Sequence, residues 1–305
     1  MHWLEAVTRL RERRRPGVLV TLASVAGHAP RAAGAKMVVG RSASWGSIGG
    51  GNLEETALRR ARDLLAALDA GARPGPQTLT VGLTDHAVNA HGRQCCGGRV
   101  EVLFEPIPVV PAVAVVGLGH VGIELARILA RHDVELHLVD SRAAALEPER
   151  LAVLDDAVAR VHRHHAPVPE LALGQVPPGT HVLIMTHDHA EDLALCDAAL
   201  RSSHLGPVGL IGSAAKWSRL RRALASEGHP PEAISAIRCP IGLPQVRGKE
   251  PATIAVAVAA ELVAAFDGAT PAPAAAPGSA PGSVVEASAA HASSGAFDDG
   301  RGEGS

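Results

Sequence analysis

The stretch that most constrains the fold is GLGHVG at residues 117–122, which follows an apolar segment and opens a helical one. In such a loop, Gly117, Gly119 and Gly122 permit a tight turn and a close approach of helix to strand, and the helix N-terminus favours a phosphate. Asp140 ends the next apolar segment, where a carboxylate can bond a ribose hydroxyl. The pattern predicts a Rossmann-type domain. Dinucleotide binding is a separate question, because glycines also serve packing alone.

Strand and helix patterns alternate after this loop. Such alternation predicts parallel strands joined by crossover helices, and therefore an α/β fold with a doubly wound sheet. A nearly continuous apolar run at residues 250–266 predicts a buried closing helix. The predicted strands cover residues 112–117, 134–140, 181–186 and 207–213.

Composition divides the chain into four parts. Residues 1–106 mix helical and strand patterns, which predicts an N-terminal α+β domain. Residues 107–111 lie in a proline-rich stretch and are interpreted as a linker to the Rossmann-like domain at 112–267. The tail, residues 268–305, is rich in Ala, Pro, Gly and Ser and is predicted to be disordered.

Composition also excludes several classes of protein. The chain has 305 residues, a net charge of −2 and only 2% aromatic residues, which argues against nucleic-acid binding. We expect no membrane association, because no run reaches the roughly 18 apolar residues of a spanning helix. The charged N-terminus predicts no export signal. Four cysteines are too few for a disulfide framework, so we expect a cytoplasmic location.

A second glycine-rich loop lies at residues 46–55, GSIGGGNLEE. It precedes an amphipathic helical pattern, so its backbone N–H groups can hold an anion. Asn52 and Glu55 are expected to cap the helix. Capping leaves the three glycines 49–51 unexplained, because each glycine carries an entropic cost. We therefore expect a bulky ligand to approach Gly49, Gly50 and Gly51.

Functional side chains are expected where the strand at 181–186 ends, since ligands of open α/β sheets bind at the carboxyl ends of strands. His187, Asp188 and His189 follow it. They can bind a metal, act as acid and base, or hydrogen-bond the loop. Ligand contact or hydrogen bonding is favoured over a structural zinc, because the spacing matches no familiar metal motif.

Three further groups receive simpler interpretations. Ser213 and Lys216 stand at another strand-to-helix junction, where a hydroxyl and a cation suit an oxyanion. The run VHRHH at residues 161–165 is interpreted as surface. Cys196 lies within an apolar helical run and is predicted to be core.

The sequence QCCGG holds two adjacent cysteines, Cys95 and Cys96, in a loop that Arg93 and Arg99 flank. Adjacent cysteines rarely form a disulfide with each other, because the geometry is strained. Nearby cations lower the pKa of a thiol. Redox chemistry, sulfur transfer and soft-metal ligation all remain open from the spacing alone.

Together these stretches resemble the xanthine dehydrogenase accessory protein family, of the XdhC/CoxI type. The resemblance covers roughly residues 5–266 and keeps the order of the motifs. The motifs that carry it are GSIGGGNLEETAL, QCCGG, VVGLGHVG, MTHDHAEDLALCDAAL, GLIGSAAKWSRLRRAL and CPIGLPQVRGKEPATIAVAVAAEL.

This resemblance implies a maturation factor and not a catalyst. Such a protein binds the molybdenum cofactor, protects it during sulfuration and delivers it to a molybdenum hydroxylase such as xanthine dehydrogenase. The implied partners are the apo-hydroxylase, a cysteine desulfurase and a second copy of the chain in a homodimer. By resemblance, Cys95 and Cys96 are candidates for the molybdenum end of the cofactor, and Gly49–Gly51 for its phosphate.

Two alternatives use the Rossmann domain. An NAD(P)-dependent oxidoreductase would take NAD in preference to NADP, because of Asp140, with His187 or His189 as acid or base. A nucleotide-sensing module would bind the dinucleotide without turnover. Under either alternative the cofactor contacts are the glycines of residues 117–122, Asp140 and the groups at the strand ends.

Overall fold

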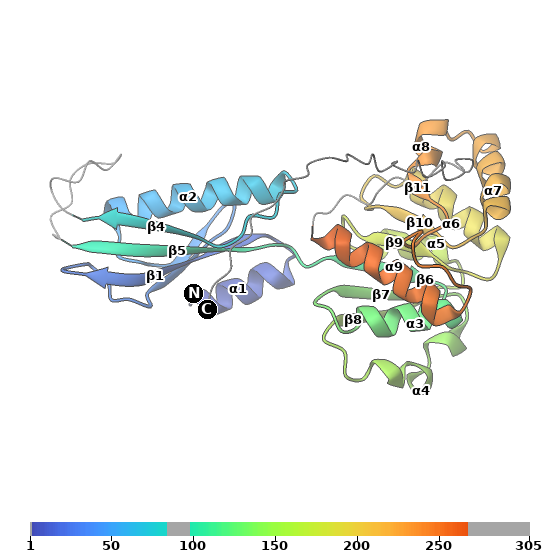
Figure 1. The fold of residues 1–305 in the computed structure, drawn as a ribbon, viewed down its shortest axis with the longest axis horizontal. Coiled ribbons are helices and arrows are strands. Elements are labelled where there is room, and N and C mark those ends of the chain that lie inside the picture. Colours follow the sequence, from blue (N-terminus) through green and yellow to red (C-terminus); the bar gives the residue numbers. More distant parts are fainter. Residues whose placement is uncertain (1, 84–97, 268–305) are drawn as a thin grey trace, which may run out of the picture. The chain divides into compact units, whose positions relative to one another are not determined.

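A computed structural model describes residues 2–83 and 98–267 of the chain, and two separate sheets lie within these ranges (Figure 1). One sheet belongs to the N-terminal region and the other to the region that follows residue 111. The predicted tail at 268–305 and the cysteine pair at 95–96 lie outside the described residues.

The N-terminal sheet is antiparallel with the order β3-β2-β1-β5-β4. Residues of β1 alternate between its faces, so Val18 and Val20 join one apolar cluster and Leu19 another. Helix α2 packs in the first cluster and α1 in the second, so the two helices cover opposite faces (Figure 1). The elements are α1 Trp3–Glu12, β1 Gly17–Ala26, β2 Lys36–Val39, β3 Ser44–Gly46, α2 Gly51–Asp69, β4 Gln77–Gly82 and β5 Arg99–Ile107.

The second sheet has the order β11-β10-β9-β6-β7-β8, and its strands are parallel. The order reverses at β6, as in a doubly wound fold, which confirms the predicted Rossmann-like architecture. The strands are β6 Ala112–Val116, β7 Glu135–Asp140, β8 Arg160–His165, β9 His181–Ile184, β10 Val208–Leu210 and β11 Ile237–Arg238.

Helices cover both faces of this sheet. Strand β6 is buried throughout, with Val113 and Val115 packed toward α3 and α9 and with Ala114 and Val116 packed toward α5, α6 and α7. The α-helices are α3 His120–Leu129, α4 Pro148–Leu151, α5 Pro169–Ala172, α6 His189–Arg201, α7 Ala214–Ser226, α8 Pro231–Ser235 and α9 Pro251–Phe266. Short 3₁₀ helices are η1 Ala143–Leu146, η2 Ala152–Leu154 and η3 Leu173–Gln175.

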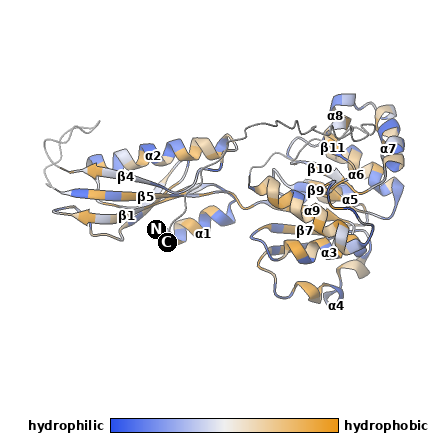
Figure 2. Ribbon diagram, in the orientation of Figure 1, coloured by the Kyte–Doolittle hydropathy of each residue, from blue (hydrophilic) through white to orange (hydrophobic). Residues whose placement is uncertain are grey.

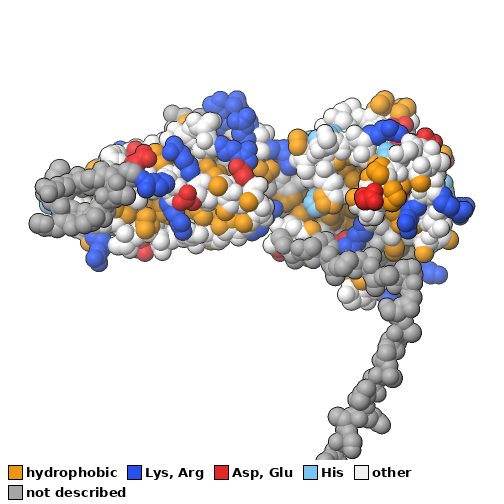
Figure 3. Space-filling model, turned by 90° about the horizontal axis from the view of Figure 1, so that it is seen from above, with side chains coloured by type: hydrophobic (Ala, Val, Ile, Leu, Met, Phe, Trp, Pro, Cys, Tyr) orange, Lys and Arg blue, Asp and Glu red, His pale blue; other side chains and the backbone are white. Residues whose placement is uncertain are grey.

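The hydropathy of each helix matches its burial. Figure 2 shows blue and orange residues alternating along α2, whereas α9 is apolar around most of its circumference. Most of α9 is buried or half-buried, as its sequence predicts. Within the described ranges, no helix combines the length and the apolar character needed to cross a membrane. On the face seen in Figure 3, acidic side chains lie among the basic and apolar ones.

Two sequence interpretations are wrong. The run VHRHH belongs to β8, an edge strand with His162 and His164 half-buried, and only His165 of its three histidines is exposed. Because β8 pairs with the buried strand β7, the side chains of His162 and His164 are partly covered. Helix α2 is not capped by Asn52, because the helix begins at Gly51 with Gly50 at the N-cap and no side-chain cap from the described residues.

Candidate functional site

A cleft of about 320 Å³ lies at the carboxyl ends of the parallel strands. This volume is at the lower end of the range for small-molecule sites. Five of the residues predicted from the sequence line it: Gly117, Gly119, Gly122, Asp140 and His187. The doubly wound topology brings them together, because β6, β7 and β9 all end at this edge of the sheet.

The three glycines of the loop have different roles: two allow close packing and one leaves the cleft open. Gly117 has a φ of +100°, and an added Cβ would lie 2.7 Å from the Met185 backbone. At Gly122 an added Cβ would lie 2.2 Å from the Gly117 carbonyl oxygen. Packing therefore accounts for both. An added Cβ at Gly119 meets no described atom within 4 Å, so that glycine leaves the cleft open.

The N-terminus of α3 faces this opening. Gly119 is its N-cap, and no side chain among the described residues caps the helix. The first N–H groups of a helix lack partners within the helix, and the helix dipole adds a partial positive charge there. The arrangement suits a phosphate or another anion.

Asp140 braces the glycine loop. Its buried carboxylate accepts hydrogen bonds from Leu118 N at 2.7 Å and from Arg142 N and Nε at 2.9 Å each. Burial by itself raises the pKa of Asp140, but the bonds from Arg142 and Leu118 outweigh it and hold the pKa below the usual value. Asp140 is thus an anion whose lone pairs are directed at protein donors.

Arg142 bears on the expected preference for NAD over NADP. It is half-exposed, lines the cleft and pairs with Asp140. An arginine at this position can face a 2′-phosphate, which weakens the argument for NAD over NADP that Asp140 alone supported. Ribose binding by Asp140 remains a prediction.

Of the two histidines expected at the end of β9, the cleft includes only His187 in its lining. His187 is exposed and lines the cleft, whereas the lining does not include the exposed His189, the first residue of α6. Asp188 is the N-cap of α6 and accepts from Ala190 N at 2.7 Å. Bonds from the Glu191 and Ala190 N–H groups lower the pKa of Asp188. Hydrogen bonding thus explains Asp188, and ligand contact by His187 remains a prediction.

Lys216 lies in a buried ion pair. Its Nζ pairs with Asp192 and donates to the Ile211 carbonyl oxygen at 3.1 Å. The side chain of Asp192 is only 1% exposed, and it also accepts from Thr186 Oγ1 at 2.8 Å. Ser213 Oγ caps α7 by accepting from Lys216 N. The cleft lining includes neither Ser213 nor Lys216, so their oxyanion role remains a prediction with no support from this geometry.

Sequence reasoning missed the importance of Asp192. The available signal was its position one helical turn after Asp188, on a helix that starts at a strand end. Two thiols lie near this pair. Burial raises the pKa of Cys196 to about 12 and that of Cys239 to about 11, so neither is a reactive thiolate.

The second glycine loop already contains a carboxylate. Glu54 Oε1 accepts from Ile48 N at 3.0 Å, from Gly49 N at 3.2 Å and from the Ser47 hydroxyl. Burial raises the pKa of Glu54, but these hydrogen bonds prevail and lower it. Glu54, and not the predicted Glu55, is the acidic residue that serves this loop. A phosphate at Gly49–Gly51 would meet this negative charge.

The comparisons with known proteins agree with this fold. The family model described as the XdhC Rossmann domain matches residues 113–262, and the model of the XdhC and CoxI family matches residues 10–75. The chain belongs to the XdhC family.

The chain is also similar to a bacterial protein and to a solved bacterial structure. The Escherichia coli K12 protein YqeB, described as uncharacterized, is 23% identical over 263 residues, which cover 86% of this chain and 46% of YqeB. The chain thus spans about half the length of this relative. A Bacillus halodurans crystal structure, described as a xanthine dehydrogenase, is 18% identical with a TM-score of 0.44, covering 90% of this chain and 98% of that one.

Proposed function

We propose that this XdhC-family chain binds the molybdenum cofactor, protects it while its terminal sulfur is installed, and delivers it to a molybdenum hydroxylase. The single observation that carries this proposal is the match of both regions of the chain to XdhC family models. Under the proposal the chain works as a homodimer and contacts a cysteine desulfurase and the apo-hydroxylase.

The cleft residues fit one part of this cofactor. Molybdopterin carries an anionic phosphate, and the open Gly119 with the uncapped N-terminus of α3 offers N–H donors to an anion. Arg142 adds a half-exposed cation to the same cleft. We therefore assign the phosphate to α3 and not to Gly49–Gly51, where Glu54 already accepts the loop N–H groups.

When bound, the cofactor supplies the metal centre and the sulfur chemistry. The N–H groups at the start of α3 and the guanidinium of Arg142 hold and orient its phosphate. Cys95 and Cys96 remain candidates for the molybdenum end, and they lie outside the described residues.

A pair of glycine variants tests the assignment. Gly119→Val fills open space in the cleft, while Gly174→Val adds the same atoms at η3, where an added Cβ also meets no described atom within 4 Å. Both proteins are purified from a host that makes the cofactor, and bound molybdenum and oxidised-pterin fluorescence are measured. We expect Gly119→Val to lose most of its cofactor and Gly174→Val to retain it. Equal cofactor content in both variants contradicts the assignment.

The same cleft supports a second candidate function, nucleotide binding. Gly117, Gly119, Gly122, Asp140 and Arg142 line one cleft at the carboxyl ends of the strands, where doubly wound folds bind dinucleotides. A nucleotide sensor would bind NADH or NADPH without turnover, whereas an oxidoreductase would turn it over with His187 as the exposed acid or base. Titration of the purified chain with each nucleotide, followed by fluorescence, separates these functions from cofactor carriage.

A further inference from the structure

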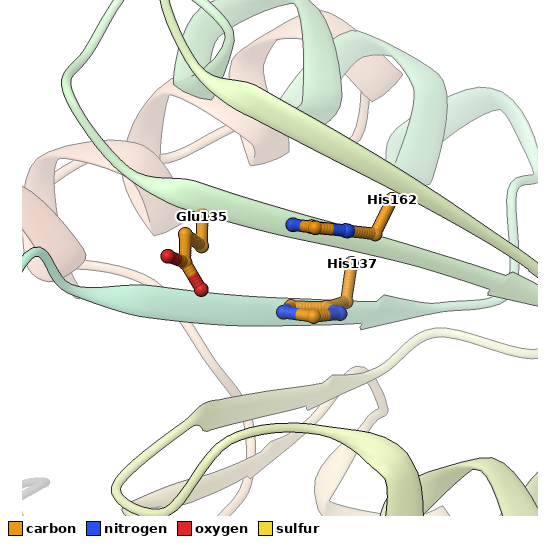
Figure 4. Close-up of side chains that lie close together, drawn as sticks. All are labelled: Glu135, His137 and His162. Carbon is orange, nitrogen blue, oxygen red and sulfur yellow. The ribbon is translucent and has the colours of Figure 1, made fainter. Parts of the chain in front are cut away.

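A second cluster of polar side chains lies on a face of the parallel sheet, away from the cleft residues. It consists of Glu135 and His137 on β7 with His162 and His164 on β8 (Figure 4 shows the first three). Side chains two residues apart share one face of a strand, and His137 is the register partner of His162. The two strands therefore present all four side chains to the same side.

The ligand atoms of three of these residues converge. One carboxylate oxygen of Glu135 and one ring nitrogen each of His137 and His162 lie within 4.8 Å of one another. The rings of His137 and His162 stack with centroids 4.6 Å apart and planes 10° apart. Figure 4 shows the Glu135 carboxylate beside the two rings, with one oxygen nearer to them than the other. The two ring planes are nearly parallel, so the imidazoles must rotate for their lone pairs to meet at one metal ion.

Both rings carry an unused nitrogen. Nε2 of His137 and Nε2 of His162 are buried and have no hydrogen-bond partner among the described residues. His137 as a whole is only 4% exposed. An unpaired buried polar atom destabilises the fold, so a bound cation would remove this cost at two positions together.

His164 sets the orientation of the buried ring. His137 Nδ1 lies 3.0 Å from His164 Nε2, so one of these nitrogens donates to the other. When His137 donates, its Nε2 keeps a free lone pair directed into the cluster. Histidines that bind metals commonly donate their second ring N–H to a neighbouring acceptor in this way.

We propose that Glu135, His137 and His162 form a binding site for a divalent cation of the zinc type, which joins the edge strand β8 to β7. Imidazole nitrogens and a carboxylate are ligands that Zn²⁺ accepts in tetrahedral sites, and three protein ligands leave a fourth position for water or an incoming group. Hard cations such as Mg²⁺ prefer oxygen ligands and do not suit two imidazoles.

Two arginines compete with the metal for Glu135. Arg14 Nη1 lies 2.9 Å from one carboxylate oxygen, and Arg160 Nη1 lies 3.4 Å from the other. The Arg160 side chain is 49% exposed, so its hold on Glu135 is weak. Replacing Arg160 should free the Glu135 carboxylate to bind the metal more tightly. We expect Arg160→Gln to tighten Zn²⁺ binding by about threefold, the size of an exposed charge interaction.

Titration of the full chain tests the site. The protein is first stripped with a chelator, and Zn²⁺ is then added at neutral pH while binding is followed by calorimetry. We expect a single site that is weakened at least about 100-fold by His162→Gln and by Glu135→Gln, with Mg²⁺ failing to bind. His165→Gln is the matched control, because His165 is exposed and lies on the opposite face of β8.

Cobalt distinguishes this site from the cysteines. Co²⁺ bound by Glu135, His137 and His162 gives ligand-field bands without a thiolate charge-transfer band. His162→Gln and Glu135→Gln must keep the far-ultraviolet circular dichroism of the unmodified chain to count as evidence. Zn²⁺ binding that survives both substitutions, a Co²⁺ spectrum dominated by thiolate charge transfer, or no saturable binding overturns the proposal.

Discussion

The role of Asp140 as the brace of the glycine loop leads to a quantitative prediction for Asp140→Asn. The carboxylate accepts from Leu118 N, Arg142 N and Arg142 Nε, and an amide keeps only one of the two acceptor oxygens. Hydrogen bonds to charged groups contribute about 1.5–3 kcal/mol each, and an orphaned buried N–H costs about 1–3 kcal/mol. Because Arg142 is half-exposed, its charge adds little. We expect a loss of about 2–4 kcal/mol in the free energy of unfolding of the second domain.

Urea denaturation measures this loss. Trp217 packs at the edge of the α5–α7 cluster, so its fluorescence in a Trp3→Phe, Trp45→Phe background reports on this domain. Asp156→Asn is the control, because the side chain of Asp156 is 63% exposed and its pair with Arg131 should contribute at most about 1 kcal/mol. Equal urea midpoints for Asp140→Asn and Asp156→Asn would refute the claim that Asp140 stabilises the glycine loop.

The pH dependence of stability provides a second check on Asp140. Its pKa in the folded protein lies below the usual value of an aspartate, so the folded state binds the proton less readily than the unfolded state. The stabilisation is therefore fully present above the unfolded pKa and is lost as the pH falls through the folded one. Asp140→Asn should remove this part of the acid dependence, which a urea midpoint series at decreasing pH measures.

Three further predictions follow from buried contacts. Lys216→Met leaves Asp192 without its counter-ion and should cost about 3–5 kcal/mol in urea denaturation, and adding Asp192→Asn should recover part of that loss. Glu54→Gln should lower stability by about 1–2 kcal/mol without changing molybdenum content, and a large loss of cofactor would return the phosphate to this loop. Gly122→Ala should raise the proteolytic susceptibility of the second domain, because its Cβ would lie 2.2 Å from the Gly117 carbonyl oxygen, and unchanged resistance would contradict that packing.

The second domain was predictable because its signals are local. An apolar strand, a glycine loop and a helix follow one another, and strands that alternate with helices specify a parallel doubly wound sheet. The same logic placed Asp140 and His187 at the strand ends, where they line the cleft. The close packing at Gly117 and Gly122 was also predictable from the motif.

The features that the sequence did not predict depend on contacts between segments far apart in the chain. Strand β8 is polar, so VHRHH lacks the alternation of a half-buried strand, and only pairing with β7 shows that His162 faces His137. Lys216 and Asp192 lie on different helices, and no spacing rule joins them. Glu54 was overlooked beside Glu55 because a capping-box pattern was assumed where the loop folds back on the helix.

The most direct measurement of the central claim is cofactor transfer. The full chain, loaded in a host that makes molybdenum cofactor, is mixed with an apo molybdenum hydroxylase, and the recovered hydroxylase activity is compared with that from an equal amount of free cofactor. We expect faster and more complete activation by the loaded chain, with molybdenum leaving it in proportion. Activation no better than that by free cofactor, or a chain that carries no pterin from a host shown to make it, would contradict the claim.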